Sequence, residues 1–327
     1  MGVILATLGA AALYWRHSEL YPSTNNAYTG TDIVRVAAVV SGPVIHVYVT
    51  TDATVDADEP LFDIDPTPYE AALRAARAQF DAAASASGTA ADDLKQAATR
   101  LEEKRKGLDD TLETYRQAKD AQSPDQTPST QFTDATKTWQ EALKAYREAE
   151  DEFDASQDKQ LTVTTPTVQL RAAAAQLDKA THDRVKTHVT APAKGTLSNL
   201  SLRPGVTIRA GAPVFAIIEG ERWWVNANFK ETDLARIKVG QKATIALDMY
   251  PATMFDGVVE SISAGSGATF SVLPPENATG NWVKVTQRFP VRIDITDPGQ
   301  NPDQPLRAGA SATVTVDTTE DSTQDGQ

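Results

Sequence analysis

The feature that most constrains the fold is a repeat within the chain. Residues 41–65 and residues 194–218 align without a gap, at an offset of 153 residues. Several matched positions carry the same residue, among them Gly42 and Gly195, Pro60 and Pro213, and Phe62 and Phe215. Apolar positions that match over the full length at one fixed offset indicate two copies of one structural unit.

Each copy has the pattern of short β-strands. Val47 and Val49 alternate with polar residues in the first copy, and Leu200 and Leu202 do so in the second. This alternation is typical of half-buried strands, and residues 203–205 (Arg-Pro-Gly) give a turn signal. Neither copy can bury its apolar face alone, so we expect the two to pack on each other as one small domain.

The two copies resemble the halves of a biotinyl/lipoyl-type domain. In carrier domains of that type the halves follow each other directly, and the modified lysine lies on the hairpin between them. Here residues 66–193 separate the halves. A split lipoyl-like domain with a long helical insertion resembles the membrane fusion proteins, periplasmic adaptors of the HlyD family and its EmrA-type subgroup. The segment Lys186–Pro192 (KTHVTAP) before Gly195 resembles the same family. One departure is the turn at residues 56–59 (Asp-Ala-Asp-Glu), where the family carries a Lys-Gly-Asp-like sequence.

The insertion, residues 66–188, predicts long helices. Apolar residues recur every seven positions, which is typical of a coiled-coil seam; they include Leu94, Leu101, Leu108, Tyr115, Phe132, Trp139, Tyr146 and Phe153. The tip of a helical hairpin is expected at about residues 123–130, because prolines there stop any helix. This leaves arms of equal length and places the interruptions at Gly88 and Pro166 opposite each other. We therefore expect an antiparallel two-helix hairpin in two stacked segments, reaching about 80 Å. A four-helix bundle folded at those interruptions is the alternative.

The resemblance implies that the hairpin tip docks a partner. The tip residues are Ser123, Pro124, Asp125, Gln126, Thr127 and Pro128. Their small and polar side chains contribute little to a core, so this stretch is free to contact another protein.

Residues 189–218 form the second half of the lipoyl-like domain, and residues 219–317 are expected to form a β-barrel, because short strands alternate there with Gly and Pro turns. Residues 273–293 resemble the EmrA-type subgroup most specifically. The family-motif residues of the barrel are Asn228, Lys230, Glu231, Asn277, Gly280, Asn281, Trp282, Gln287 and Arg288. The polar tail, residues 318–327, is expected to be disordered.

The N-terminus is apolar over residues 1–15, which at 1.5 Å per residue is short for a bilayer core of about 30 Å. Residues 16–32 resemble the adaptor segment that follows a single inner-membrane helix. We therefore expect a transmembrane anchor at residues 1–20 and an N-terminal strand with the first half-motif at residues 21–65. A cleaved signal peptide is the alternative, and the native start can lie upstream.

Composition excludes several classes of protein. The net charge of −13 argues against a nucleic-acid surface. The absence of cysteine excludes disulfides and thiolate sites, and the four histidines lack metal-site spacing. No nucleotide-binding or hydrolase motif is present. We expect no catalytic residues, no cofactor and no metal, and hence no enzyme.

The sequence therefore predicts an α+β multidomain adaptor, anchored in the inner membrane of a Gram-negative bacterium with most of its chain in the periplasm. The resemblance implies three partners: an inner-membrane transporter of the proton-driven major facilitator type, an outer-membrane channel, and further copies in a trimeric or hexameric ring. One alternative is an adaptor for an ABC-type or type I secretion exporter. The other is a lipoyl carrier of an acyltransferase, which is disfavoured because no lysine-bearing hairpin joins the two halves in this chain.

Overall fold

The computed structural model describes residues 19–87, 91–121, 129–162, 168–266, 286–298 and 304–319. Its contacts divide the chain into two compact units. One unit holds residues 33–218, and the other holds the remainder on either side, residues 1–32 and 219–327. Each unit is described by itself below.

The two repeat copies fold together, and strands of one copy pair with strands of the other. The first copy contributes β2 (Gly42–Val47), β3 (Thr54–Val55) and β4 (Pro60–Ile64). The second contributes β6 (Gly195–Ser198), β7 (Thr207–Ile208) and the start of β8 (Pro213–Lys230). β2 pairs with β7, and the equivalent strand β6 pairs with β3, both antiparallel. Val49 and Leu202 share one buried core, so the prediction that the half-motifs pack together is confirmed.

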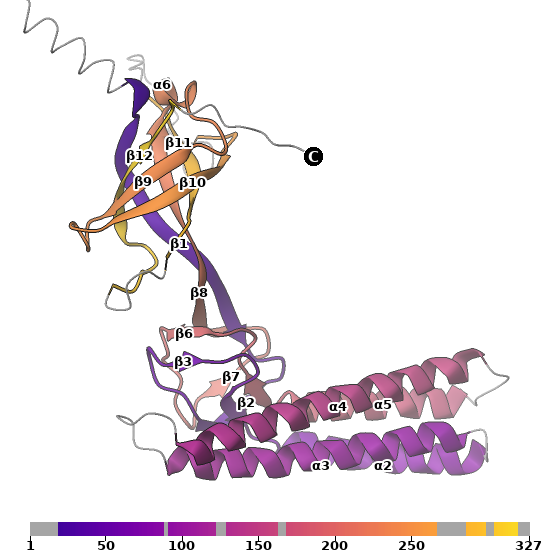
Figure 1. Ribbon diagram of the computed structural model, residues 1–327. Helices are drawn as coiled ribbons and strands as arrows, with labels where there is room; N and C mark the ends of the chain where they lie inside the picture. The colour runs from indigo at the N-terminus through magenta and orange to yellow at the C-terminus, as the bar shows by residue number, and fades with distance from the viewer. Residues whose placement is uncertain are drawn as a thin grey trace, which may run out of the picture. The chain divides into compact units, whose positions relative to one another are not determined.

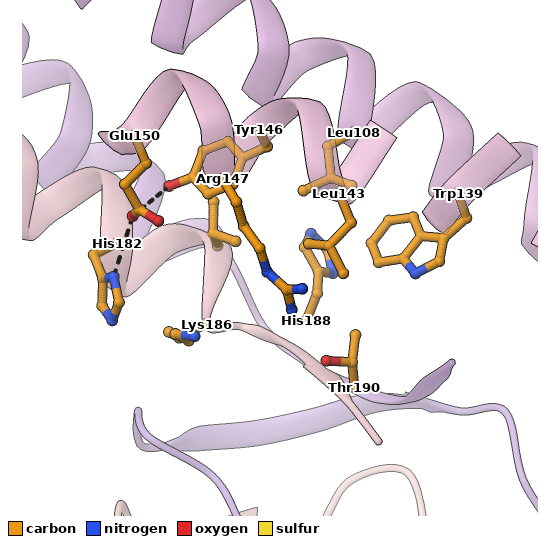
Figure 2. Close-up of a pocket in the computed structure, with 11 residues that line it drawn as sticks. Leu108, Trp139, Leu143, Tyr146, Arg147, Glu150, His182, Lys186, His188 and Thr190 are labelled. Atoms are coloured by element: carbon orange, nitrogen blue, oxygen red, sulfur yellow. Dashed lines mark hydrogen bonds and ion pairs between the residues drawn. The ribbon is translucent and has the colours of Figure 1, made fainter. Parts of the chain in front are cut away.

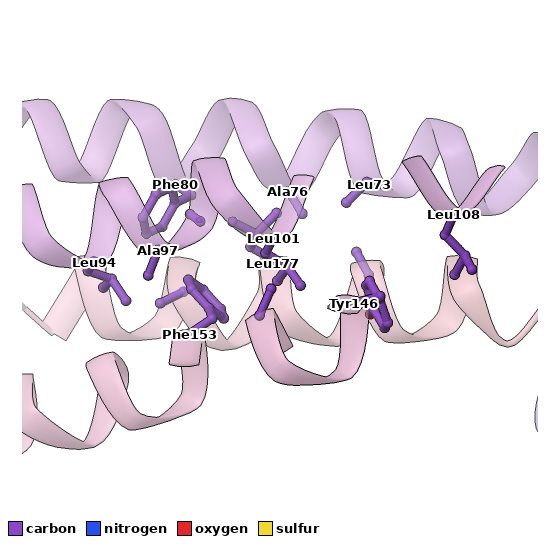
Figure 3. Close-up of a cluster of buried hydrophobic side chains, with 14 of the residues drawn as sticks. Leu73, Ala76, Phe80, Leu94, Ala97, Leu101, Leu108, Tyr146, Phe153 and Leu177 are labelled. Atoms are coloured by element: carbon purple, nitrogen blue, oxygen red, sulfur yellow. The ribbon is translucent and has the colours of Figure 1, made fainter. Parts of the chain in front are cut away.

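Four long helices form the insertion: α2 (Thr67–Ser87), α3 (Asp92–Asp120), α4 (Thr130–Thr162) and α5 (Val168–Val185). α3 lies against α4 and α2 against α5, as the equal arms predict. All four helices nevertheless contribute to one buried core (Figure 3). Phe80 of α2 meets Phe153 of α4 edge to face, with ring centroids 6.4 Å apart. The Arg77 guanidinium of α2 donates to the carbonyl of Ala98 in α3 at 3.0 Å.

The extended two-segment hairpin is therefore wrong, and the insertion is a four-helix bundle (Figure 1). The ends of α3 and α4 that approach the predicted tip lie beside the first half-motif. The Tyr115 hydroxyl donates to Glu59 Oε1 at 3.0 Å, and the Trp139 indole donates to the carbonyl of Asp58 at 3.0 Å. This end of the helix pair is consequently not distal. Residues 123–128 themselves lie outside the described residues.

The second unit is a closed β-barrel. Its strands are β1 (Ser23–Ala37), β12 (Ser311–Val316), β9 (Lys242–Leu247), β10 (Met254–Ile262), β11 (Arg288–Ile295) and the later part of β8. They pair in that order, and a further pairing of β1 with β8 closes the circle among the described strands. Alternate residues of β8, including Val225, Ala227 and Phe229, are fully buried, because successive side chains point to opposite faces of a strand.

The short helix α6 (Glu231–Leu234) follows β8, and β5 (His188–Thr190) leads from α5 into the second half-motif. None of the described helices is long and apolar enough to cross a membrane. Residues 1–18, which include most of the predicted anchor, and the tail from residue 320 lie outside the described part of the chain.

Candidate functional site

The predicted barrel motif gathers at one end of the barrel. Lys230 of β8 lies opposite Arg288 of β11 in the strand register. The backbone amide of Glu231 donates to the carbonyl of Gln287 at 3.0 Å. Arg288 Nη1 donates to the carbonyl of Asn228 at 2.9 Å. Five motif residues from two separate segments, residues 228–231 and 287–288, thus meet at one rim.

The N-terminal segment completes this rim. Asn228 Nδ2 donates to both the carbonyl and the side-chain oxygen of Asn26, at 3.2 and 3.1 Å. Arg236, just after α6, forms an ion pair with Glu19 at 3.1 Å and donates to the carbonyl of that residue at 3.0 Å. Lys230 and Glu231 are exposed beside these contacts. The rim therefore combines the start of the described chain with exposed charges of both signs. Asn277, Gly280, Asn281 and Trp282, the other motif residues, lie outside the described residues.

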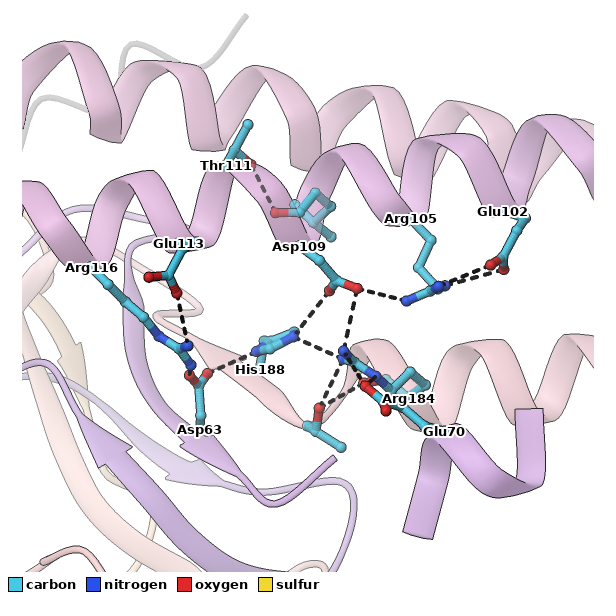
Figure 4. A network of polar contacts seen from close by, with 12 residues as sticks. Asp63, Glu70, Glu102, Arg105, Asp109, Thr111, Glu113, Arg116, Arg184 and His188 are labelled. Carbon is cyan, nitrogen blue, oxygen red and sulfur yellow. Dashed lines mark hydrogen bonds and ion pairs between the residues drawn. The ribbon is translucent and has the colours of Figure 1, made fainter. Parts of the chain in front are cut away.

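A second polar cluster, which the sequence analysis missed, joins the helices to the half-motif strands (Figure 4). His188 of β5 lies at its centre. Its Nδ1 is 2.8 Å from Asp63 Oδ1 of β4, and its Nε2 is 3.4 Å from Asp109 Oδ1 of α3. Arg184 at the end of α5 pairs with Asp109 at 3.3 Å and with Glu70 of α2 at 3.2 Å. We call this set the His188 network.

The network continues along α3. Arg116 pairs with Asp63, and the Tyr48 hydroxyl donates to the same carboxylate. Arg105, whose side chain is 10% exposed, pairs with Asp109 at 2.6 Å. Removing one partner of a buried charge pair is strongly destabilising, because the remaining charge is left unpaired away from water. The network therefore holds the helices in one position against β4 and β5.

Charged neighbours shift the pKa values of Asp63, Asp109 and His188. Burial opposes ionisation of Asp63, but the contacts with His188, Tyr48 and Arg116 outweigh it and hold its pKa below the ordinary value. Burial likewise opposes ionisation of Asp109, yet His188, Arg184 and Arg105 lower its pKa. Burial opposes protonation of His188, whereas Asp109 and Asp63 raise its pKa above the ordinary value. Arg184 Nη1, 2.9 Å from His188 Nε2, opposes a charge on the imidazole, but the two aspartates outweigh this effect and the net direction favours protonation of His188.

The contacts of the network join the helices to the strands. The aspartates around His188 are engaged by arginines as well as by the imidazole, and no described group of His, Asp and Glu side chains has an arrangement that could hold a metal ion. A small hollow of about 50 Å³ lies next to the network, between α3, α4, α5 and β5 (Figure 2). Trp139, Leu143 and Tyr146 form its apolar wall. A signal for the network existed in the sequence, since His188 and Asp63 both lie in the motifs that resemble the family, but nothing there paired them.

Comparison with known proteins covers almost the whole chain. Residues 32–219 match the family described as RND MFP, barrel-sandwich hybrid domain, and residues 222–317 match the AAEA-like beta-barrel domain. Multidrug export protein EmrA of Escherichia coli is 30% identical over 324 residues, which is 97% of this chain and 81% of the relative. Colistin resistance protein EmrA of Acinetobacter baumannii is 31% identical over 341 residues, covering 96% of this chain and 92% of the relative.

A solved structure shows the same fold. The MacA-MexA chimeric protein, which contains the Pseudomonas aeruginosa MexA alpha-hairpin domain, aligns with a TM-score of 0.50 at 17% identity. The alignment covers 91% of this chain and 82% of the chimera. The strand-exchanged half-motifs, the helical insertion, the barrel and the relatives together assign the protein: the chain belongs to the membrane fusion protein family of periplasmic adaptors, in its EmrA-type subgroup.

Proposed function

We propose that this chain is the periplasmic adaptor of a multidrug efflux system and couples an inner-membrane transporter to an outer-membrane channel. The observation that carries the proposal is the full-length match to two EmrA proteins, named for multidrug export and colistin resistance. The fold agrees, because the hybrid domain and the barrel are scaffolds with no catalytic cluster among their described residues. An adaptor of this kind works by binding partners and is not an enzyme.

The barrel rim supports a membrane-proximal role for the second unit. Arg236 binds Glu19, at the end of the predicted anchor (residues 1–20), and Asn228 binds Asn26, six residues after it. The rim therefore lies where the chain would leave the membrane, and we propose that Lys230 and Glu231 contact the transporter there. Single-pass anchoring in the inner membrane and assembly into a trimeric or hexameric ring belong to this proposal.

A deletion experiment tests the proposed function. Loss of the gene is expected to sensitise cells to amphipathic toxic compounds, and the wild-type gene on a plasmid is expected to restore resistance. A plasmid that carries Lys230→Glu with Glu231→Lys keeps the composition but exchanges the two exposed charges, and we expect it to restore resistance poorly. Unchanged susceptibility in the deletion strain, with the transporter intact and no redundant pump, would contradict the proposal.

The energy source distinguishes the two exporter classes. A transporter of the major facilitator type uses the proton gradient, whereas an ABC-type exporter hydrolyses ATP. We propose the proton-driven class, because residues 273–293 resemble the EmrA-type subgroup; relatives named for multidrug export and multidrug resistance support it. Dye efflux that stops with a protonophore while cellular ATP is maintained supports this class; efflux that follows ATP and not the gradient supports the ABC or type I secretion alternative.

The docking role of residues 123–128 stays a prediction. Replacing Asp125 and Gln126 with tryptophan is expected to leave the fold intact and to abolish efflux, if this stretch contacts the channel. Normal export by the variant would exclude that role.

A further inference from the structure

A groove runs along the junction of β1, β5 and the helices, in the unit that holds residues 33–218. It has a volume of about 570 Å³ and is lined by residues 34–37 of β1, Val39 just after β1, and residues 188–192 in and after β5. Asp58, Arg147 and Lys186 complete the lining. This volume lies within the range of about 300–1,000 Å³ that small-molecule sites occupy. The groove shares Arg147, Lys186, His188 and Thr190 with the hollow of Figure 2.

The charge of the groove is opposite to that of the chain. The chain carries a net charge of −13, yet Arg35, Arg147 and Lys186 all line the groove. Asp58 is the one acidic residue among its described lining residues, and Arg147 binds both of its carboxylate oxygens, at 2.7 and 3.1 Å. Arg35 and Lys186 form no ion pair with any described residue. Among the described residues, these two cations thus have no acidic ion-pair partner.

Apart from these charged residues and the polar His188 and Thr190, the lining of the groove is apolar. Val34 of β1, Val39 just after β1, Val189 of β5 and Pro192 after β5 all line the groove. Val39 is 57% exposed, so a ligand that covers it removes apolar surface from water. A recess with two unpaired cations beside a row of valines matches a molecule with one anionic group and an apolar body.

We propose that this groove binds an anionic amphiphile, with its anionic group at Arg35 and Lys186 and its apolar body along Val34 and Val39. This inference concerns a ligand of the adaptor itself and does not rest on the proposed coupling of transporter and channel. A titration with the purified chain tests it, because that measurement needs neither partner.

Isothermal titration calorimetry with dodecanoate below its micelle concentration is the experiment. We expect saturable binding of about one dodecanoate per chain, and no comparable binding of dodecyltrimethylammonium, which has the same tail and the opposite charge. The double variant R35Q/K186Q is expected to weaken dodecanoate binding about tenfold or more, because it removes both unpaired cations. The variant Val39→Ser is expected to weaken it about threefold through lost apolar contact.

The matched control is R74Q/R171Q. It removes the same number of positive charges from exposed positions on α2 and α5 that do not line the groove, and it should bind dodecanoate like the wild type. Equal weakening in both double variants would reduce the effect to net charge and contradict a site. Equal binding of both detergents would contradict it as well.

Two further outcomes would assign the groove to something else. Cosedimentation with phosphatidylglycerol vesicles, without binding of monomeric dodecanoate, would mean that the cations contact a lipid surface. Protection of residues 34–39 from hydrogen exchange that follows protein concentration, and not dodecanoate, would mean that a second copy of the chain covers them. Either result would overturn the proposal.

Discussion

At the scale of single residues, the repeat explains an unusual backbone. Gly205 and Gly211 of the second copy have φ of +91° and +76°. The matched residues of the first copy, Asp52 and Asp58, have φ of +63° and +62°. Asp tolerates this left-handed region better than most residues but less well than Gly. Asp58 occupies the position at which the second copy has Gly211, and it forms an ion pair with Arg147 at 2.7 Å.

This geometry predicts different costs for two substitutions at Asp58. Asp58→Ala and Asp58→Gly both remove the ion pair, which is partly exposed and worth about 0.2–1 kcal/mol. Asp58→Ala also places a Cβ with no local hydrogen bond at positive φ, so we expect it to be less stable than Asp58→Gly by about 1 kcal/mol. Urea unfolding measures the difference. Equal stability of the two variants would show that the backbone at residue 58 is not left-handed.

The His188 network predicts a pH dependence of stability. A raised pKa of His188 means that its contribution is complete below its ordinary value of about 6.5 and is lost as the pH rises through the folded-state pKa. The lowered pKa values of Asp63 and Asp109 mean that their contributions are complete above about 3.9 and are lost in acid. Stability should therefore be highest between about pH 4 and pH 6.5.

The measurement is the thermal unfolding midpoint from pH 4 to pH 9. We expect the midpoint of the wild type to fall above pH 6.5, and His188→Gln to flatten that decline while lowering stability at pH 6 because it leaves Asp63 and Asp109 without the imidazole. The exposed His46 provides the matched control, since His46→Gln should keep the wild-type slope. An unchanged slope in His188→Gln would exclude the network as its source.

At the scale of elements, the sequence predicted which helices pair but not how the pairs fold. A heptad pattern predicts that a helix packs against one other helix, but it does not show whether a second helix pair packs on the opposite face. The buried residues of α3 are Leu94, Ala97, Ala98, Leu101, Arg105, Leu108, Leu112, Tyr115 and Ala118. Seven of them, from Leu94 to Tyr115, follow the alternating spacing of four and three residues that a two-stranded coil also has, and only Ala97 and Ala118 lie outside it. Only two alanines extend the stripe beyond the seam, so hydrophobic spacing alone did not distinguish a helix pair from a four-helix bundle.

The sequence predicted one of the two candidate sites, the barrel rim, and not the other, the His188 network. Resemblance to the family identified Asn228, Gln287 and Arg288, and the strand register brings them together at the rim. The His188 network could not be predicted, because Asp63 and His188 are 125 residues apart and only the bundle's position brings Asp109 to them. Buried charge pairs between distant segments leave no periodic pattern in a sequence.

The folded-back bundle predicts a short distance between the half-motif and the end of α3. Lys119 Nζ lies 3.7 Å from Glu59, whereas an extended hairpin would carry residue 119 about 80 Å away from the base of the arms. Spin labels on Asp56→Cys and Lys119→Cys test this, and the chain has no other cysteine. We expect a separation below about 25 Å, given side-by-side elements about 10 Å apart and flexible labels. A distance near that of the extended arm would show that the bundle opens in solution.

At the scale of the whole molecule, the two units have separate cores. One buried cluster fills the barrel, from Ala27 to Val316, and two others fill the hybrid domain and the helical bundle. All residues of the latter two clusters lie between positions 36 and 217, within the unit that holds residues 33–218. Cutting the chain at the unit boundaries therefore removes no member of these cores. Domains with a core of their own fold independently.

We accordingly expect residues 33–218, expressed alone, to fold. The fragment keeps both repeat copies, the four helices and every partner of His188, so its helical circular dichroism should be lost in one cooperative thermal transition. The decline of its midpoint above pH 6.5 should match that of the intact chain, because the network lies wholly inside it. A fragment of residues 33–193, which lacks the second repeat copy, serves as the control and should not fold, since the first copy cannot bury its apolar face alone. If residues 33–218 stay unfolded while the intact chain folds, the stability of this unit depends on the barrel.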